Sequence, residues 1–505
     1  MKVVFVLYDS LNRHALSCYG SPTRTANFDR LARRAVRFDN HYVGSLPCMP
    51  ARRDMMSGRL SFLHRAWGPL EPFDNAFPEL LAASGVYSHL VTDHYHYWED
   101  GGATYHGRYD TFEFIRGKER DPWAAVVDPD WNAIAERTHP VQSSRKRRDK
   151  FAQYALNRVH FKSDDDFPSK QCFASGLQFL RNNRGSDNWF LQLETFDPHE
   201  PFHAPDRFRE NFPTNYRGPR LDWPPYARMT QAFDEQAELK ANYQAILQLC
   251  DEELGQLLDL FDEQNLWADT ALVVSTDHGF LLGEHDWWAK INMPCYNEIA
   301  HIPLLIYHPS FAHKGGERRQ ALTQTIDLMP TFLDMFGVPI PPHVEGKSLL
   351  PLLDADRPIR EACIFGLFGS AVNVTDGRYV YFRYPTDVLA GDLFQYTLMP
   401  AHMKQLFSLD ELREATLAPG FGFTKGAPLL KVPATPKSPV YFTHGPGGQK
   451  DTETVLFDLA TDQGQQHPVQ DAEVEARMVG HIRRLMEQND APPEAYRRLG
   501  LAGPA

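Results

Sequence analysis

The sequence of 505 residues has no apolar run long enough to cross a membrane. A membrane-spanning helix needs about 18 to 20 consecutive apolar residues, and the apolar run at residues 3–8 is far shorter. That run is also too short for the core of a secretory signal, and no small-residue cleavage site follows it. We therefore expect a cytoplasmic protein.

The sequence is also short of positive charge and of cysteine. Its formal net charge is −13, whereas a nucleic-acid-binding protein needs a basic face, so this class of partner is excluded. The basic run at residues 145–148 is followed by acidic residues, and we interpret it as a solvated surface segment. Six cysteines in so long a chain do not indicate a disulfide framework. We interpret five of them (Cys18, Cys172, Cys250, Cys295 and Cys363) as small buried hydrophobic residues.

Short apolar runs alternate with longer helical patterns in the first two thirds of the chain. Runs at residues 3–8, 189–193 and 271–275 are typical of strands, and patterns near 27–36 and 234–263 are typical of helices. This alternation predicts an α/β fold with a mixed, mainly parallel sheet sandwiched by helices. Ligands bind at the carboxyl ends of strands in such folds. Asp9 follows the first run and the Asp277-His278 pair follows the third, which predicts metal-type ligands at one sheet edge.

The pattern changes after about residue 365. Short strands are predicted at residues 371–373, 379–384, 440–443 and 455–457, a loop or arm at 416–439, and a helix at 471–488. We therefore predict a catalytic domain at residues 1–365 and a smaller α+β subdomain with an antiparallel sheet at 366–505. The segment 385–435 is long enough to be an exchange arm between protomers, which favours a homo-oligomer, and a dimer in particular.

One short motif gathers a nucleophile and a cation. In Cys48-Met49-Pro50-Ala51-Arg52, the proline favours the first turn of a helix. Cys48 would then lie at a helix N-terminus, where free N–H groups and the helix dipole favour anions. Arg52 is four residues on and falls on the same face. Taken alone, the motif is a weak signal, and the simpler interpretation is a buried structural cysteine beside a helix-capping proline.

Beyond this motif, the sequence resembles the formylglycine-dependent (type I) sulfatases of the alkaline phosphatase superfamily over residues 1–355. The resemblance rests on several segments in the family's order. They are Tyr8-Asp9, Cys18-Tyr19-Gly20, residues 27–32, 48–52 and 57–59, residues 196–201, residues 276–279, 283–285 and Lys290, residues 326–331 and residues 346–350.

The resemblance implies an alkaline phosphatase-like fold and a hydrolase of sulfuric esters. Cys48 would be converted by a formylglycine-generating enzyme into formylglycine, whose hydrated aldehyde attacks the ester. The metal ligands would be Asp9, Asp277, His278 and the modified Cys48, and the other catalytic residues Arg52, His199 and Lys290. The resemblance predicts one divalent ion, Ca²⁺, with Mn²⁺ as the alternative.

The sequence departs from the family pattern at two places. Many members carry a second acidic ligand after the first, where this chain has Ser10. Sulfatases usually also carry a Gly-Lys-x-His segment after the second strand, and the corresponding residues 90–98 contain no lysine. Thr92, His94 and His96 are candidates for the missing substrate contact, and the sequence does not choose among them.

These departures leave alternatives open. The related phosphonate monoester hydrolases also use formylglycine without that lysine, so a phosphonate monoester or phosphodiester hydrolase is the second hypothesis. Both types of substrate present a singly charged anion, which makes promiscuity between them reasonable. A non-catalytic anion-binding protein is a third hypothesis, and a metal-dependent phosphomutase, which normally has Ser or Thr in place of Cys48, is a fourth.

Overall fold

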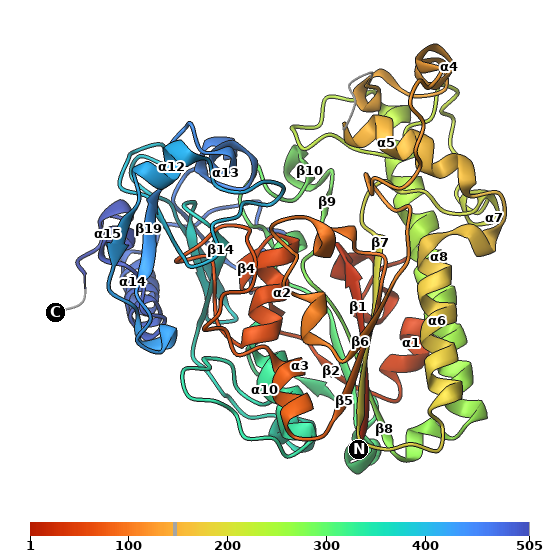
Figure 1. The fold of residues 1–505 in the computed structure, drawn as a ribbon, viewed down its shortest axis with the longest axis horizontal. Helices are drawn as coiled ribbons and strands as arrows, with labels where there is room; N and C mark the ends of the chain where they lie inside the picture. Colours follow the sequence, from red (N-terminus) through yellow and green to blue (C-terminus); the bar gives the residue numbers. More distant parts are fainter. Residues whose placement is uncertain (145–148, 504–505) are drawn as a thin grey trace.

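The computed structural model describes residues 1–144 and 149–503; the basic run at 145–148 lies outside them. An eight-stranded sheet in the order β12-β2-β11-β8-β1-β7-β5-β6 forms its centre (Figure 1). Its strands are β1 (Lys2–Asp9), β2 (Val36–Phe38), β5 (Tyr87–Thr92), β6 (Thr111–Phe114), β7 (Trp189–Pro198), β8 (Thr270–Thr276), β11 (Leu304–Tyr307) and β12 (Arg318–Arg319). Neighbours from β8 to β6 are parallel, whereas β11 is antiparallel to both β8 and β2. The predicted mixed, mainly parallel sheet is confirmed.

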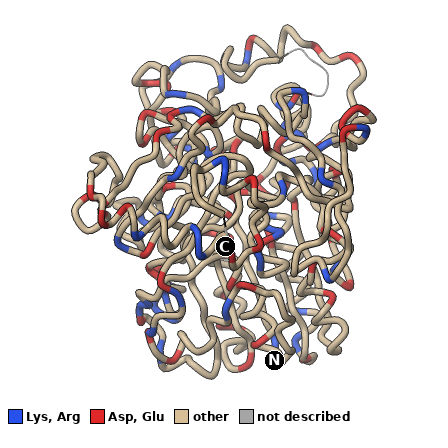
Figure 2. Tube along the Cα trace, turned by 90° about the vertical axis from the view of Figure 1, so that its left-hand side faces the viewer, with Lys and Arg blue, Asp and Glu red and all other residues tan. Residues whose placement is uncertain are grey.

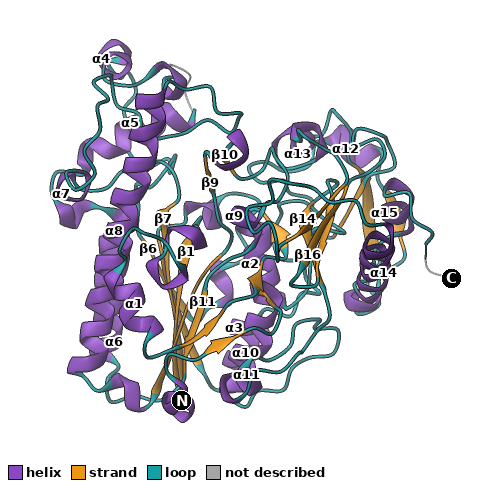
Figure 3. Ribbon diagram, turned by 180° about the vertical axis from the view of Figure 1, so that it is seen from behind, coloured by secondary structure: helices purple, strands orange, loops and turns teal. Residues whose placement is uncertain are grey.

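Side chains of β1 alternate between two separate cores. Residues 4, 6 and 8 pack with α1 (Ala26–Ala32), α6 (Pro168–Asn182) and α8 (Phe233–Glu263). Residues 3, 5 and 7 pack on the opposite face with α2 (Cys48–Ser57), α3 (Phe77–Ala83) and α10 (Leu328–Met335). The two helical layers are seen from both sides in Figures 1 and 3. A strand buried on both faces has no polar positions, which explains the continuous apolar run.

A second sheet joins the C-terminal part of the chain to the nucleophile region. It has the order β20 (Val455–Asp458), β16 (Tyr379–Arg383), β15 (Val372–Thr375), β14 (Cys363–Leu367) and β4 (Ser45–Leu46). Its pairs are antiparallel except for β14 with β4. Helix α14 (Ala472–Gln488) packs on it through Met478, Ile482 and Met486. Since β4 immediately precedes α2, this sheet supports the segment that carries Cys48.

The segment predicted as an exchange arm folds against its own chain. It contains a three-stranded sheet of β17 (Phe394–Thr397), β19 (Leu429–Pro433) and β18 (Thr416–Ala418). The Tyr396 N–H donates to the His64 carbonyl (3.0 Å), and the Leu398 N–H donates to Glu71 (2.8 Å). Residues 416–439 are therefore not only a loop. The predicted dimer stays a prediction.

Two local predictions were wrong. Residues 440–443, expected as a strand, lie in α13 (Pro439–Thr443), because Pro439 after Ser438 begins a helix. The helix expected at 27–36 ends at Ala32, and Val36 already belongs to β2.

An insertion between β6 and α6 stands above the carboxyl edge of the main sheet (Figure 1). It carries α4 (Trp131–Glu136) and α5 (Lys150–Asn157), and α7 (Asp206–Arg209) lies beside it. The remaining short elements are β3 (His41–Tyr42), β9 (Leu281–Leu282), β10 (Trp288–Ala289), β13 (Thr323–Gln324), α9 (Asn297–Ala300), α11 (Leu350–Asp354), α12 (Leu409–Arg413) and α15 (Pro493–Arg498). Among the described residues, no helix combines the length and the apolar character that a membrane span requires. Acidic and basic residues are interspersed along the Cα trace in Figure 2.

Candidate active site

Four predicted residues from three elements meet at the carboxyl edge of the main sheet. Asp9 ends β1, Asp277 and His278 follow β8, and Cys48 begins α2. One ligand atom from each lies within 4.8 Å of all the others, and all four residues are buried. The structure thus brings together the ligand set that the sequence predicted.

The chemistry of these four side chains fits a divalent cation. The Nδ1 atom of His278 is hydrogen-bonded to the Gly279 carbonyl (2.9 Å), which makes Nδ1 the donor and leaves the Nε2 lone pair free. That Nε2 lies 3.3 Å from the Cys48 sulfur. Burial alone would raise the pKa of Asp9, but Lys290, His199 and Arg52 together hold that pKa well below its ordinary value. An ionised carboxylate and a neutral imidazole are the forms that bind metal.

Arg52 is a buried cation held by three acids, which lie on β1, on β7 and directly after β8. Its guanidinium donates to Glu194 (2.7 Å), Asp277 (2.6 Å) and Asp9 (3.0 Å), and also to the Cys48 carbonyl (3.1 Å). Burial would lower the pKa of Arg52, but these acids, Glu194 first, raise it well above its ordinary value. The planar guanidinium therefore fixes the orientation of the Asp9 and Asp277 carboxylates relative to α2.

Lys290 and Ser10 form a second link to the same acids. The Lys290 ammonium donates to the Ser10 hydroxyl (2.7 Å) and lies 3.6 Å from both the Cys48 sulfur and Asp9. The Ser10 hydroxyl in turn donates to Asp9 (2.8 Å), and its N–H donates to Asp277 (3.1 Å). Despite burial, the neighbouring Cys48 and Asp9 raise the pKa of Lys290, so it is protonated. Ser10 thus connects these groups at the position where the sequence departs from the expected second acidic ligand.

His199 lies at the wall of the same pocket. Its Nδ1 is hydrogen-bonded to the Glu200 carbonyl (2.5 Å), which leaves Nε2 for the pocket side. Burial, together with Lys290, lowers the pKa of His199 well below its ordinary value. The ring packs edge-on against Phe196 (4.4 Å between centroids).

The three tentative substrate-binding residues have three different surroundings. His94 Nε2 lies 3.2 Å from Asp9, so this histidine contacts a predicted metal ligand. His96 lines the pocket, with its Nδ1 2.5 Å from Glu99. Thr92 is buried, and its hydroxyl accepts from the His94 N–H (2.9 Å). Among the three, His96 alone belongs to the described pocket lining.

The Cys48 thiol is shielded from solvent, with 2% of the residue exposed. Burial first, and then the charge of Asp9, raise the pKa of Cys48 well above its ordinary value. These surroundings favour the neutral thiol over the thiolate, and the thiolate is the nucleophilic form of cysteine.

A pocket of about 510 Å³ opens from Cys48 between three parts of the chain. The main domain contributes Cys48, His199 and Lys290, the insertion contributes Arg120 and Lys150, and residues 402–405 and 439–444 close the other side. The sequence did not reveal Arg120, Lys150 or the buried Glu194. Only Glu194 left a signal, an acid directly after the apolar run at 189–193.

Comparison with known proteins agrees with this geometry. The family model described as Sulfatase matches residues 2–338, and a model described as N-sulphoglucosamine sulphohydrolase, C-terminal, matches residues 283–417.

Individual relatives are distant but extensive. An N-acetylglucosamine-6-O-sulfatase of Bacteroides thetaiotaomicron is 25% identical over 408 residues, which are 70% of this chain and 70% of the relative. A solved structure of a protein in complex with its substrate D-glucosamine-2-N,6-O-disulfate superposes with a TM-score of 0.66 at 16% identity, covering 98% of this chain and 99% of that one. The phosphonate monoester hydrolase of Agrobacterium radiobacter superposes with a TM-score of 0.64 at 17% identity, covering 97% and 95%. At such identities the two structures show the fold alone.

Proposed function

This chain belongs to the sulfatase family, and from that premise we propose that it hydrolyses a sulfate ester with a nucleophile made from Cys48. The observation that carries the proposal is the grouping of Cys48 with Asp9, Asp277 and His278 within 4.8 Å, with Lys290 3.6 Å from the sulfur. A non-catalytic anion-binding protein would not need this ligand set beside a helix N-terminus.

The sulfur of Cys48 stands in for the oxygens of formylglycine. In that form the residue would carry hydroxyl groups in place of the thiol, at the same position beside Lys290 and His278. Because 2% of Cys48 is exposed in the folded chain, a formylglycine-generating enzyme would have to reach the segment before folding is complete.

Asp9, Asp277, His278 and modified Cys48 would hold one divalent ion, which when bound supplies positive charge against the ester oxygens. With Ser10 rather than a further carboxylate, the set suits Ca²⁺ or Mn²⁺.

Other residues of the chain would orient the ester and move protons. Arg52 keeps Asp9 and Asp277 in place and adds fixed positive charge. The Lys290 ammonium holds a proton at Nζ and would stabilise charge that develops on an ester oxygen. His199, anchored through Nδ1, would accept or return a proton at Nε2 next to the leaving oxygen.

The pocket wall supports an anionic leaving group. Lys150 lies over the rings of Phe151, Trp223 and Tyr226, at 5.0, 4.8 and 5.0 Å from their centroids. Within the described residues, no carboxylate lies within ion-pair distance of its ammonium. Arg120 and Lys404 line the same pocket, and Trp67 offers an apolar face. We propose a ring-shaped leaving group with a further negative charge, as in a sulfated sugar carrying a second acidic group.

A phosphonate monoester or phosphodiester is the second candidate substrate. It is favoured by His94, which stands against Asp9 in the segment where sulfatases usually carry a lysine. The ammonium group of that lysine is missing from this segment, so selection for the sulfate group is weaker.

We also keep a cytoplasmic location in the proposal. All six cysteines are free thiols, which suits a reducing compartment.

The test is kcat/KM for an aryl sulfate and an aryl phosphonate monoester, measured side by side. The enzyme is metal-loaded, and conversion of Cys48 is confirmed by peptide mass. We expect a clear preference for sulfate. A preference for the phosphonate would assign the chain to the second candidate, and turnover of neither would contradict the proposal.

A further inference from the structure

A second, larger pocket lies at the opposite end of α5 from the active site. Lys150, the first residue of α5, lines the pocket of Cys48, whereas Arg158, directly after α5, lines a separate pocket of about 870 Å³. The same division holds for the neighbouring loop, where His199 faces the first pocket and His203 the second. The two linings share no described residue, so the second pocket is not an extension of the catalytic site.

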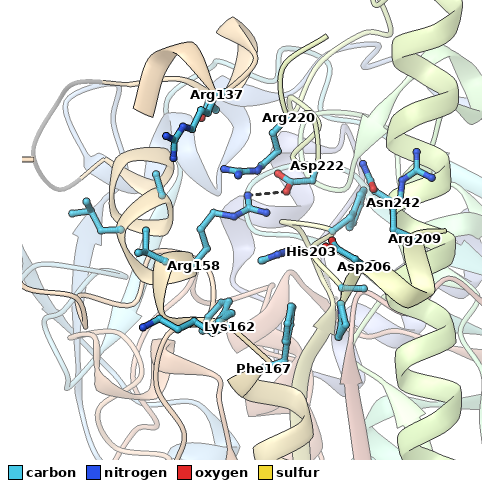
Figure 4. Close-up of a pocket in the computed structure, with 18 of the residues that line it drawn as sticks. Arg137, Arg158, Lys162, Phe167, His203, Asp206, Arg209, Arg220, Asp222 and Asn242 are labelled. Carbon is cyan, nitrogen blue, oxygen red and sulfur yellow. Dashed lines mark hydrogen bonds and ion pairs between the residues drawn. The ribbon is translucent and has the colours of Figure 1, made fainter. Parts of the chain in front are cut away.

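Two arginines are held side by side at this pocket by the backbone. The Arg220 N–H donates to the Arg137 carbonyl (3.2 Å), and the Arg220 carbonyl accepts from the His139 N–H (2.9 Å). Figure 4 shows Arg158 and Arg220 beside Asp222, with Arg137 on the far side of Arg220. Three cations from three segments thus line this pocket, and two of them lie beside one carboxylate.

That carboxylate is already engaged. One oxygen of Asp222 accepts from Arg158 (2.8 Å), and the other accepts from the side chain of Gln142 (2.9 Å). In the described chain, no carboxylate lies within ion-pair distance of Arg137 or Arg220. Partial desolvation, followed by the charge of Arg158, lowers the pKa of Arg220; Asp222 opposes this shift, and Arg137 adds to it. The like charges of Arg158 and Arg137 thus disfavour the charged form of Arg220, with Asp222 as the acid that opposes them.

The other acids of the lining are used elsewhere. Asp164 and Glu238 pair with Arg207 and Arg209. Asp130 accepts from two N–H groups at the start of α4, and Asp206 begins α7. These contacts leave Arg137 and Arg220 without an ion pair to any described acid of the lining.

The floor of the pocket is aromatic. The rings of Phe161 and Phe167 lie 5.3 Å apart, and His203 lies 5.0 Å from Phe167. His203 is fixed by a hydrogen bond with the Tyr154 hydroxyl (2.9 Å). A rigid apolar floor below a group of guanidinium donors is typical of sites that orient a ligand through a few polar contacts.

We propose that this pocket binds an oxyanion of the sulfate or phosphate class, with Arg137, Arg158 and Arg220 as donors. Guanidinium groups form paired, charge-assisted hydrogen bonds to such oxygens, and a doubly charged anion offsets the repulsion between Arg137 and Arg220. The anion is either free in solution or a group carried on an extended sulfated saccharide.

The experiment is isothermal titration of the full-length chain in chloride buffer at constant ionic strength. One arm uses sodium sulfate, and the other uses an oligosaccharide with several sulfate groups. The Arg137→Gln/Arg220→Gln double variant is compared with wild type and with Arg217→Gln, an exposed arginine near Arg220 that does not line the pocket. Because Arg137, Arg217 and Arg220 are exposed, we expect these substitutions to leave folding unaffected, which circular dichroism checks.

For one sulfate-binding event, we expect the dissociation constant of the double variant to be about ten-fold higher than that of wild type, or more. The kcat/KM of the double variant for a small aryl sulfate should equal that of wild type. The titrations of Arg217→Gln should also equal those of wild type. Weakening in both arms identifies a site for the free anion, whereas weakening of the oligosaccharide alone identifies a group carried on the saccharide. If all three proteins give superimposable titrations in both arms, the pocket is not an oxyanion site.

Discussion

At the scale of single residues, the chemistry depends on one sulfur atom among charged neighbours. Cys48 lies beside Lys290 and His278 at the start of α2. Replacing Cys48 with Ala removes the atom that carries the nucleophile but leaves the carboxylates and Arg52 in place. We expect kcat for an aryl sulfate to fall by roughly a thousand-fold or more, with metal content unchanged or modestly lower.

The control for this variant is Cys172→Ala, which removes a buried thiol in the core on the other side of the sheet. It should keep wild-type kcat while showing a similar loss of thermal stability. Wild-type turnover by Cys48→Ala would show that the nucleophile is misassigned.

Lys150 gives a prediction about substrate choice. Its ammonium has three aromatic rings around it and lines the active-site pocket. For Lys150→Met we expect KM for 4-sulfooxybenzoate to rise about ten-fold, because a charge-assisted contact is lost. KM for 4-nitrophenyl sulfate should change less than two-fold, roughly, since its ring carries no second charge. Steady-state kinetics with both substrates, and with the exposed Lys437→Met as control, check this. Equal changes for both substrates would contradict a role in recognising the second charge.

Residues differ in how far the sequence reveals them. Asp9 and Asp277 were predictable because parallel strands end at the same edge. Arg120 and Lys150 lie in an insertion without a family motif, and each is brought to the site by tertiary contacts. Glu194 was missed although it follows an apolar strand, since a single acid at a strand end is common.

At the scale of elements, the site depends on how α2 docks onto the sheet. Arg52 on α2 reaches β1, β7 and the residue after β8 through Asp9, Glu194 and Asp277. Glu194 also accepts from Tyr97 (3.0 Å) and Gln192 (3.0 Å). This acid does not line the pocket, so it is a positioning residue.

We expect Glu194→Gln to lower kcat about ten- to a hundred-fold with little change in KM. The amide keeps the shape but weakens the hold on Arg52, and the loss of charge-assisted hydrogen bonds should cost about 1–3 kcal/mol of unfolding free energy. Kinetics and chemical denaturation measure the two effects. Glu194→Asp, which keeps the charge, should recover part of kcat. An unchanged kcat in Glu194→Gln would show that Arg52 needs no third acid.

The elements themselves were predicted well where burial is uniform. The apolar runs before Asp9 and Asp277 became β1 and β8, and the pattern at 234–263 became α8 (Phe233–Glu263). The failure at α13 has a local cause. The apolar residues 440–443 resemble a strand, but Pro439 at the helix start decides the conformation.

At the scale of the whole molecule, contacts far apart in sequence decide the pocket and its stability. The His64 ring is hydrogen-bonded through Nε2 to the Asp490 carbonyl (2.9 Å), across 426 residues. It also packs edge-on against Phe421 and Phe423, at 4.8 and 4.9 Å. No sequence pattern predicts such a pairing, although it joins the segment after α2 to the C-terminal part of the chain.

This contact predicts acid sensitivity. Burial lowers the pKa of His64 to about 3, with the charges of Arg59 and Arg53 adding to the effect and the Asp490 carbonyl opposing it. In the unfolded chain the pKa is about 6.5. Above about pH 6.5 both states are neutral, so His64 contributes no pH dependence. As the pH falls from there towards 3, the unfolded chain binds a proton that the folded chain does not, and stability is lost.

Between about pH 6.5 and about pH 5, we therefore expect wild type to lose about 2 kcal/mol more unfolding free energy than His64→Gln. The glutamine amide can still donate to the Asp490 carbonyl but does not titrate. Urea denaturation at both pH values measures the change, with the exposed His467→Gln as control. If His64→Gln and wild type lose the same free energy, His64 takes up its proton in the folded chain, and the junction that it forms opens without unfolding the rest.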